Sequence, residues 1–249
     1  MEGELYSEIL EKMHNGQKQL AVLIDPDKFE STEIIHIANE AKVDYFFVGG
    51  SLMAGGSLEQ CICTIKKQSS IPVIIFPGNN MQLCNQADGI LLVSLISGRN
   101  PELLIGQHVV AAPYLKQSGL EILSTGYILV DTGNQTSASY ISNTMPMPYD
   151  KSDIAACTAM AGEMLGFKLI YLDGGSGAAK QVSSQMITRV KKNIAIPLIV
   201  GGGIKSAEQA SMAIQAGADV LVVGNAFEKE AGLLVSIADV VHKNVVLNN

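Results

Sequence analysis

Short runs of apolar residues recur along the chain, and each run ends in Gly, Asp, Ser or Asn before a longer segment of helical character. Their nearly continuous apolar character is typical of parallel strands covered on both faces. The pattern therefore predicts eight βα units. The runs are Leu20–Ile24, Tyr45–Val48, Pro72–Phe76, Ile90–Leu95, Ile128–Val130, Leu169–Leu172, Leu198–Val200 and Val220–Val223.

The segments between these runs carry helix signals, with one exception. Ser206 stands where an N-cap belongs before Ala207–Ala216, and Gly217 fits a position just beyond the end of that helix. The segment Gly78–Asp88 is short and weakly patterned, so it leaves no room for a long amphipathic helix. We therefore expect the third helix to be short, or replaced by a strand or loop.

Alternating βα units form either a closed eight-stranded barrel or an open doubly wound sheet. Eight units in 249 residues favour the α/β (TIM-type) barrel, which typically needs about 250 residues. The G-x-G-x-x-G signature of a dinucleotide-binding sheet does not follow the first run. No linker rich in Ser, Gly or Pro divides the chain, so we expect residues 1–249 to form a single domain.

Composition narrows the class of protein further. Hydrophobic residues make up 47% of the chain and charged residues 16%, which excludes general disorder. The net charge of −7 argues against a nucleic-acid binder or a polybasic membrane anchor, because both need a positive surface. No apolar run approaches the ~18 residues of a transmembrane helix, and the acidic start of the chain is unlike a signal peptide. These observations predict a cytoplasmic protein.

Three predicted strand ends are rich in glycine, at residues 173–177 (DGGSG), 201–203 (GGG) and 224–225 (GN). In barrels of this kind the loops after strands 7 and 8, with a short extra helix, frequently form a phosphate site. Glycine lets backbone N–H groups approach an anion, and a helix N-terminus adds a favourable partial charge. Residues 226–228 are the candidate for that helix. The alternative is that these glycines only form tight βα turns.

Two acidic residues follow the first predicted strand. Asp25 comes directly after the apolar run, and Pro26 fixes the turn before Asp27. Mg²⁺ binds through one or two carboxylates and takes its other oxygens from water and substrate phosphate. Asp25 is therefore the main candidate ligand and Asp27 a weaker one, although both aspartates also suit a turn. Ser51, after the second strand, either completes the metal site or caps the next helix.

A further carboxylate, Asp173, ends the sixth predicted strand just before the glycine loop. This position suits a general base that acts on a substrate hydroxyl beside bound phosphate. Tyr171 points to the same side of the strand and is a second candidate, unless it is a core residue and Asp173 only a turn residue. Lys28 and Arg99 are candidate partners for a diphosphate, or simply solvated charges.

The histidines and cysteines predict no site of their own. His36 and His108 fall in predicted helices away from the strand ends, so we interpret them as structural. The cysteines lack the spacing of a zinc site, and we interpret them as structural or incidental thiols. They are Cys61, Cys63, Cys84 and Cys157.

The strand-end motifs together resemble the geranylgeranylglyceryl phosphate synthase family, which includes the bacterial PcrB-like heptaprenylglyceryl phosphate synthases. The GGGIKS segment alone is shared by many phosphate-binding barrels, but its combination with IDPDK and YLDGGSG is specific. The matching segments run in family order across nearly the whole chain. They are residues 23–28 (LIDPDK), 47–51 (FVGGS), 171–177 (YLDGGSG), 201–206 (GGGIKS) and 224–225 (GN).

The resemblance implies a Mg²⁺-dependent prenyltransferase on a barrel whose third helix is replaced by a strand or loop. In that reaction the C3 hydroxyl of sn-glycerol 1-phosphate attacks C1 of a long-chain prenyl diphosphate, forming an ether and releasing diphosphate. By the family pattern, Asp25 and Ser51 ligate Mg²⁺, and a homo-oligomer, a dimer or larger, is expected. The residues that hold glycerol phosphate by this pattern are Tyr171, Leu172, Asp173, Gly174, Gly175, Ser176, Gly177, Gly202, Gly203, Gly224 and Asn225.

The chain departs from the commonest family pattern at one position of the site. Many members have Tyr-Leu-Glu-Ala-Gly-Ser-Gly where this chain has Asp173 and Gly174. Aspartate keeps the charge but is shorter by one methylene, which changes the reach of the carboxylate. Two alternatives to the prenyltransferase stay open: another phosphate-binding barrel that acts on a small sugar phosphate, and a non-catalytic barrel that only binds glycerol phosphate.

Overall fold

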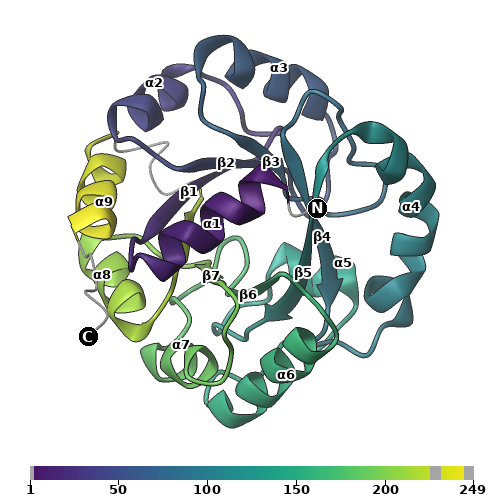
Figure 1. Ribbon diagram of the computed structural model, residues 1–249, viewed down its shortest axis with the longest axis vertical. Helices are drawn as coiled ribbons and strands as arrows, with labels where there is room; N and C mark the ends of the chain where they lie inside the picture. Colours follow the sequence, from purple (N-terminus) through teal and green to yellow (C-terminus); the bar gives the residue numbers. More distant parts are fainter. Residues whose placement is uncertain (1–2, 225–230, 244–249) are drawn as a thin grey trace.

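In a computed structural model of the chain, eight parallel strands close into a barrel around which the helices form an outer ring (Figure 1). The structure describes residues 3–224 and 231–243. Each strand pairs with the next, and β8 pairs with β1 to complete the closure. The predicted barrel is confirmed. The strands are β1 (Gln19–Ile24), β2 (Tyr45–Val48), β3 (Val73–Ile75), β4 (Gly89–Leu95), β5 (Glu121–Leu129), β6 (Leu169–Asp173), β7 (Leu198–Gly201) and β8 (Val220–Val223).

Helices follow the strands in order, except after β3, and one further helix precedes β1. The structure describes residues 76–88 throughout, and they join β3 to β4 without a helix. The prediction that the helix after the third strand is short or replaced by a loop is therefore confirmed. The helical elements are α1 (Glu4–His14), α2 (Glu33–Glu40), α3 (Leu58–Gln68), the π-helix η1 (Glu102–Gly106), α4 (Gln107–Ser118), α5 (Ser137–Ser142), α6 (Ser152–Met164), α7 (Ser184–Lys191), α8 (Ala207–Ala216) and α9 (Ala231–Lys243).

The predicted ends of helix α8 are those observed. The Ser206 hydroxyl accepts a hydrogen bond from the N–H of Gln209 at 3.2 Å, which satisfies one of the donors exposed at the first turn. Gly217 ends the helix at φ = 116°, in the left-handed region that favours glycine. Local sequence signals therefore mark both ends of this helix.

Two features of the fold go beyond the predicted elements, and they meet at Glu121. Strand β5 starts at Glu121, well before the predicted run Ile128–Val130. The prediction missed this start because Ser124, Thr125 and Gly126 interrupt the apolar pattern, although they pair with β4 like the rest of the strand. Helix α1 lies across the barrel in Figure 1, and the Glu121 carboxylate accepts hydrogen bonds from the N–H groups of its first residues, Leu5 and Tyr6.

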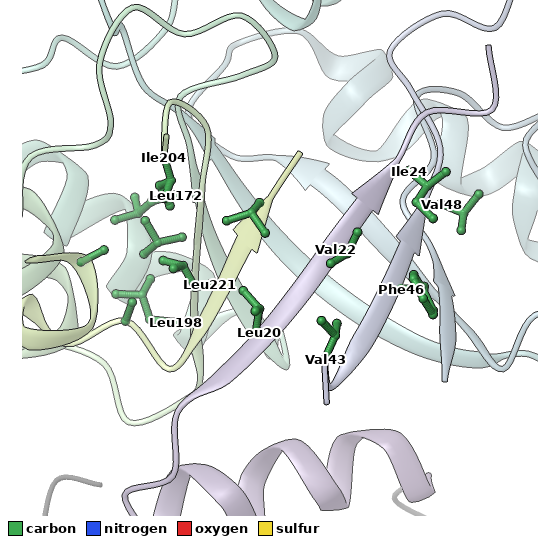
Figure 2. Close-up of a cluster of buried hydrophobic side chains, with 14 of the residues drawn as sticks. Leu20, Val22, Ile24, Val43, Phe46, Val48, Leu172, Leu198, Ile204 and Leu221 are labelled. Atoms are coloured by element: carbon green, nitrogen blue, oxygen red, sulfur yellow. The ribbon is translucent and has the colours of Figure 1, made fainter. Parts of the chain in front are cut away.

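Side chains alternate along the strands between the barrel interior and the helical ring. Leu20, Val22 and Ile24 of β1 point outward into the apolar layer that Figure 2 shows, whereas Ala21 points into the interior. The interior cluster also holds large aromatic side chains, among them Tyr171 of β6. Because both faces of each strand are covered by apolar groups, the near-continuous hydrophobic runs of the sequence are explained.

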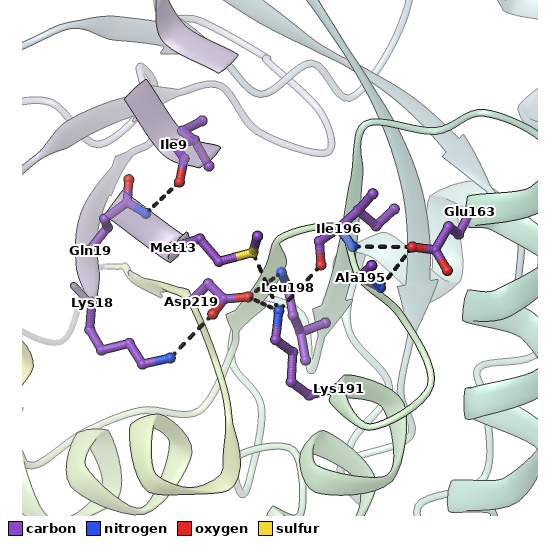
Figure 3. Close-up of polar contacts among 10 residues, drawn as sticks. All are labelled: Ile9, Met13, Lys18, Gln19, Glu163, Lys191, Ala195, Ile196, Leu198 and Asp219. Carbon is purple, nitrogen blue, oxygen red and sulfur yellow. Dashed lines mark hydrogen bonds and ion pairs between the residues drawn. The ribbon is translucent and has the colours of Figure 1, made fainter. Parts of the chain in front are cut away.

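A buried carboxylate ties together the end of the barrel opposite the strand C-termini (Figure 3). Asp219 lies 3.2 Å from Lys18 Nζ and 2.6 Å from Lys191 Nζ, and it also accepts a hydrogen bond from the N–H of Leu198. Only 2% of the Asp219 side chain is exposed. The residue therefore links the chain just before β1 to the start of β7 and the end of α7.

We expect Asp219→Ala to lower the free energy of unfolding by about 3–5 kcal/mol, because it leaves two lysines and an N–H group without their common acceptor. Urea denaturation measures this change. The arrangement of residues at the strand C-termini should stay unchanged, since Asp219 lies at the other end of the barrel. The matched control is Asp239→Ala, in an exposed ion pair with Lys243; an equal loss of stability in the control would contradict the assignment.

Candidate active site

The first strand delivers Asp25 to the C-terminal rim of the barrel, as predicted. Its Oδ2 lies 2.9 Å from Lys28 Nζ, and its Oδ1 accepts the N–H of Asp27 at 3.1 Å. Asp25 remains partly exposed at the mouth. The turn that Pro26 begins therefore brings a carboxylate and an ammonium group to the same side of the opening.

The carboxylate of Asp27 is already hydrogen-bonded within the protein. Its carboxylate accepts hydrogen bonds from three consecutive N–H groups, those of Ala54, Gly55 and Gly56. These bonds lower the pKa of Asp27, because each stabilises the charged form. Asp27 thus anchors the loop after β2, which accounts for its place beside Asp25 without a metal.

Strand β2 brings Gly50 and Ser51 next to Asp25. A Cβ on Gly50 would lie 3.3 Å from Asp25 Oδ1, so the two strand ends are in close contact. The alternative that Ser51 caps the next helix is wrong: Ser57 is the N-cap of α3, and its hydroxyl accepts the N–H of Gln60. The Ser51 hydroxyl makes no hydrogen bond with any residue that the structure describes.

On the other side of the mouth, β6 delivers Asp173, and β5 delivers a partner that the sequence did not single out. Tyr127 donates a hydrogen bond from its hydroxyl to Asp173 Oδ2 at 2.6 Å, and the N–H of Gly175 donates to Oδ1 at 2.8 Å. Burial raises the pKa of Asp173, and these two hydrogen bonds partly oppose that effect. The carboxylate is therefore held by two donors in a largely dry position.

Tyr171 is part of the aromatic core beneath Asp173. Its ring centroid lies 5.3 Å from that of Phe76 and 5.4 Å from that of Tyr127, and only 1% of the residue is exposed. A Cβ on Gly201 would lie 2.5 Å from the Tyr171 hydroxyl, so a larger residue there would displace the phenol. The neighbouring Leu172 points outward into the helical layer of Figure 2, so it can offer a ligand only its backbone.

The turn after β7 requires glycine at two successive positions. Gly202 and Gly203 have φ of 82° and 73°, and a Cβ on Gly202 would lie 2.6 Å from the N atom of Gly174. The β6 and β7 loops therefore touch through their backbones. The N–H groups of Gly177, Gly202 and Gly203 donate to no other residue among those described.

The last strand end is described only in part. Gly224 directly follows β8 at the same rim as the β6 and β7 loops. Asn225 and the predicted helix at residues 226–228 lie outside the described residues.

One pocket of about 580 Å³ joins the two sides of the mouth. Its polar part is lined by Asp25, Lys28, Ser51, Asp173 and Ser176. Its apolar part extends beside β4 and α4, where no helix follows β3 to fill the space. That part is lined by Leu83, Ile90, Leu92, Leu103, Ala111 and Leu115.

Arg99 and His108 lie differently with respect to the pocket. Arg99 is exposed, donates to the neighbouring carbonyl of Gly98 at 2.7 Å and is not among the residues that line the pocket. His108 lies in a helix, as predicted, but this helix lines the pocket, and His108 Nε2 lies 2.9 Å from the carbonyl of Val93. The helical period alone does not show that α4 borders an opening rather than a packed neighbour.

The oxygen groups at the rim are too few to enclose a metal ion by themselves. They suit a cation that is bound jointly by the protein and a ligand. No group of three His, Cys, Asp or Glu side chains arranged to hold a metal occurs in residues 3–224 and 231–243. Asp25 and Ser51 offer one carboxylate and one hydroxyl beside an open pocket. That set fits Mg²⁺, which keeps several waters and binds substrate phosphates.

Comparison with known proteins agrees with this geometry. The profile described as "PcrB family" matches residues 13–243. The chain belongs to the PcrB family.

Two proteins named geranylgeranylglyceryl phosphate synthase are similar to this chain over nearly its whole length. That of Chitinophaga pinensis is 52% identical over 97% of both chains. That of Spirosoma linguale is 55% identical over 92% of this chain and 93% of the relative.

Solved structures confirm the fold. A (S)-3-O-geranylgeranylglyceryl phosphate synthase from Thermoplasma acidophilum, in complex with its substrate sn-glycerol-1-phosphate, superposes with a TM-score of 0.89 at 31% identity, covering 98% of this chain and 99% of the other. Thiamine phosphate pyrophosphorylase from Pyrococcus furiosus, at 13% identity and a TM-score of 0.60, shares the fold alone. Among the helices described here, none has the length and apolar character needed to span a bilayer.

We expect Asp173→Asn to raise the thermal midpoint relative to the wild type, and this gain should grow between pH 4 and pH 8. The folded-state pKa of Asp173 is raised above the unfolded value of about 3.9. The contribution of this carboxyl to the stability of the folded wild type is therefore present while the carboxyl is protonated. That contribution is lost as the pH rises through the folded pKa. Thermal denaturation of both proteins across this pH range measures the difference.

Asp27→Asn is the matched control of opposite sign. Because the pKa of Asp27 is lowered, its contribution is present above the unfolded pKa and is lost as the pH falls. This variant should be less stable than the wild type between pH 4 and pH 8, with a difference that shrinks only as the pH falls below the unfolded value of about 3.9. A gain for Asp173→Asn that declines with rising pH would contradict the assignment of Asp173 as a carboxyl with a raised pKa.

Proposed function

We propose that the protein is a prenyltransferase that joins the C3 hydroxyl of sn-glycerol 1-phosphate to a long-chain prenyl diphosphate, geranylgeranyl or similar, and releases diphosphate. The observation that carries the proposal is the single pocket in which Asp25 and Asp173 face a common opening that continues into an apolar channel. The relatives named geranylgeranylglyceryl phosphate synthase, and the Thermoplasma relative solved with sn-glycerol-1-phosphate, support it.

The glycerol phosphate is assigned to the glycine-rich loops after β6, β7 and β8. Backbone N–H groups of Gly177, Gly202 and Gly203 make no hydrogen bond within the described residues and suit a phosphate dianion, so an acidic protein needs no basic patch to bind it. Ser176, which lines the pocket, adds a hydroxyl. The remaining residues assigned to this ligand are Tyr171, Leu172, Asp173, Gly174, Gly175, Gly224 and Asn225.

Asp173 is the general base in this proposal. Its raised pKa makes it a stronger base than an ordinary aspartate, and burial keeps water from competing for the substrate hydroxyl. Tyr127 and Gly175 fix the two oxygens of the carboxylate, so its direction is set before the substrate binds. Tyr171 supports this arrangement from below through its ring contact with Tyr127.

The diphosphate is assigned to the opposite side of the mouth. Asp25 and Ser51 would hold Mg²⁺ there, and the bound ion would offset the charge that develops on the leaving diphosphate. Lys28, on the same turn, provides a cationic donor to the diphosphate oxygens. Arg99 was the other candidate for this role in the sequence, and its side chain lies outside the pocket lining.

The prenyl tail is assigned to the apolar part of the pocket beside β4 and α4. Leu92, Leu103 and Leu115 line this part and carry no polar group, so burial of an isoprenoid chain there is favourable. A sugar phosphate has no apolar portion to fill this space. The channel thus favours a lipid substrate over the sugar-phosphate alternative.

Self-association is also part of the proposal, since one helical face exposes apolar side chains in the single chain. Ile105, Val109, Val110 and Tyr114 of η1 and α4 are each at least 57% exposed. We expect a second copy to cover this face in a homo-oligomer. The double substitution Val109→Glu and Tyr114→Glu should then convert the assembly to monomers in light scattering after size exclusion; a wild-type monomer would contradict the expectation.

We expect Asp25→Asn to reduce Mg²⁺-dependent transfer by at least about 100-fold, since even groups that only support a metal ligand typically contribute 10–100-fold. Incubation with sn-glycerol 1-phosphate and prenyl diphosphates of several lengths, followed by mass analysis of the product, measures the activity. Binding of sn-glycerol 1-phosphate should change little.

The exposed Asp150→Asn variant serves as the control and should keep full activity. Transfer by Asp25→Asn at the wild-type rate would remove Asp25 from the metal site. Failure of the wild type to transfer any prenyl chain would overturn the proposed function.

A further inference from the structure

A buried glutamine stands in the segment that replaces the third helix. Gln82 is only 4% exposed, and both polar atoms of its side chain are used. Its Nε2 donates to the carbonyl of Gly50 at 3.0 Å, and its Oε1 accepts the N–H of Gly78 at 3.0 Å. Gln82 therefore joins the loop after β2 to the loop after β3.

These two loops also touch through their backbones. A Cβ on Gly49 would lie 2.0 Å from the carbonyl oxygen of Phe76, and one on Gly78 would lie 2.2 Å from that of Gly50. No larger residue fits at either position without moving the partner loop. Two kinds of hydrogen bond cross this contact: the N–H of Phe76 donates to the carbonyl of Val48 at 2.9 Å where the strands end, and beyond the strands the Gln82 side chain makes the two bonds given above.

The position held in this way belongs to the cation side of the mouth. Gly50 packs against Asp25, with 3.3 Å between Asp25 Oδ1 and the place of a Gly50 Cβ, and Ser51 follows directly. Gln82 itself does not line the pocket, although Gly50, Ser51 and Gly78 do. Any effect of Gln82 on a ligand is therefore transmitted through the loops that it joins.

We propose that Gln82 is a positioning residue that sets the Gly50–Ser51 turn against Asp25 and thereby builds the diphosphate side of the site. The inference rests on the proposed function. Glutamine suits this role because its amide offers a donor and an acceptor at one end of the side chain. An apolar side chain of similar size would leave the Gly50 carbonyl and the Gly78 N–H without partners.

The test compares Gln82→Leu with Gln19→Leu. Gln19 is a second buried glutamine with two hydrogen bonds, to Ile9 and Tyr45, at the opposite end of the barrel. Calorimetric titration measures two ligands separately on each protein: a non-reactive prenyl thiolodiphosphate with Mg²⁺, and sn-glycerol 1-phosphate. Thermal denaturation reports the stability lost in each variant.

Gln82→Leu is expected to weaken Mg²⁺-dependent binding of the thiolodiphosphate by about 10–100-fold, the range seen for groups that support metal ligands. Binding of sn-glycerol 1-phosphate should stay within about twofold, because it lies on the other side of the mouth. Gln19→Leu should leave both affinities within the same limit, although its thermal midpoint falls as well.

A second variant, Gly78→Ala, attacks the same contact from the other loop without touching the core. Its methyl group meets the Gly50 carbonyl, so it should weaken thiolodiphosphate binding selectively, as Gln82→Leu does, even where the latter folds poorly. Equal weakening of both ligands, or of neither, in Gly78→Ala would overturn the assignment. If the wild type binds no thiolodiphosphate, the proposed function falls, and this inference falls with it.

Discussion

The closure of the ladder between β8 and β1 is the constraint on which the rest of this structure depends. Because all eight strands are parallel and the sheet has no free edge, every strand must deliver its C-terminal residue to the same rim. Asp25 and Asp173 are 148 positions apart in the chain, yet they line one pocket for this reason. Their shared opening follows from topology before any side chain makes a contact.

The absence of a helix after β3 changes one side of this symmetric arrangement. A helix there would cover the gap beside β4, whereas the loop of residues 76–88 leaves an apolar channel that opens into the mouth. The same loop also lacks the hydrogen bonds that a helix supplies to its own backbone. Buried side-chain bonds from Gln82 replace them, so the feature that makes room for an apolar ligand also requires a dedicated anchor.

The sequence predicted the barrel, the missing helix and the rim residues, because each depends on local patterns: apolar runs, a segment too short for a helix, and glycine or aspartate at strand ends. It could not predict partners that only tertiary packing brings together. Tyr127 lies just before the predicted run Ile128–Val130, and its bond to Asp173 joins two residues 46 positions apart on adjacent strands. Asp27 is a second example, since the N–H groups that donate to its carboxylate come from a loop after the next strand.

The departure from glutamate at position 173 is understandable in terms of these partners. An aspartate carboxylate stays closer to its own strand, and there it receives the Tyr127 hydroxyl from the adjacent strand and the N–H of Gly175 from its own turn. The register places Tyr127 opposite Tyr171, one step below Asp173 on the interior face, so the phenol reaches upward to the shorter side chain. Burial raises the basicity of the carboxylate, while the two donors keep its ionised form accessible. In the proposed reaction, the direction and environment of this shorter acid would compensate for its shorter reach.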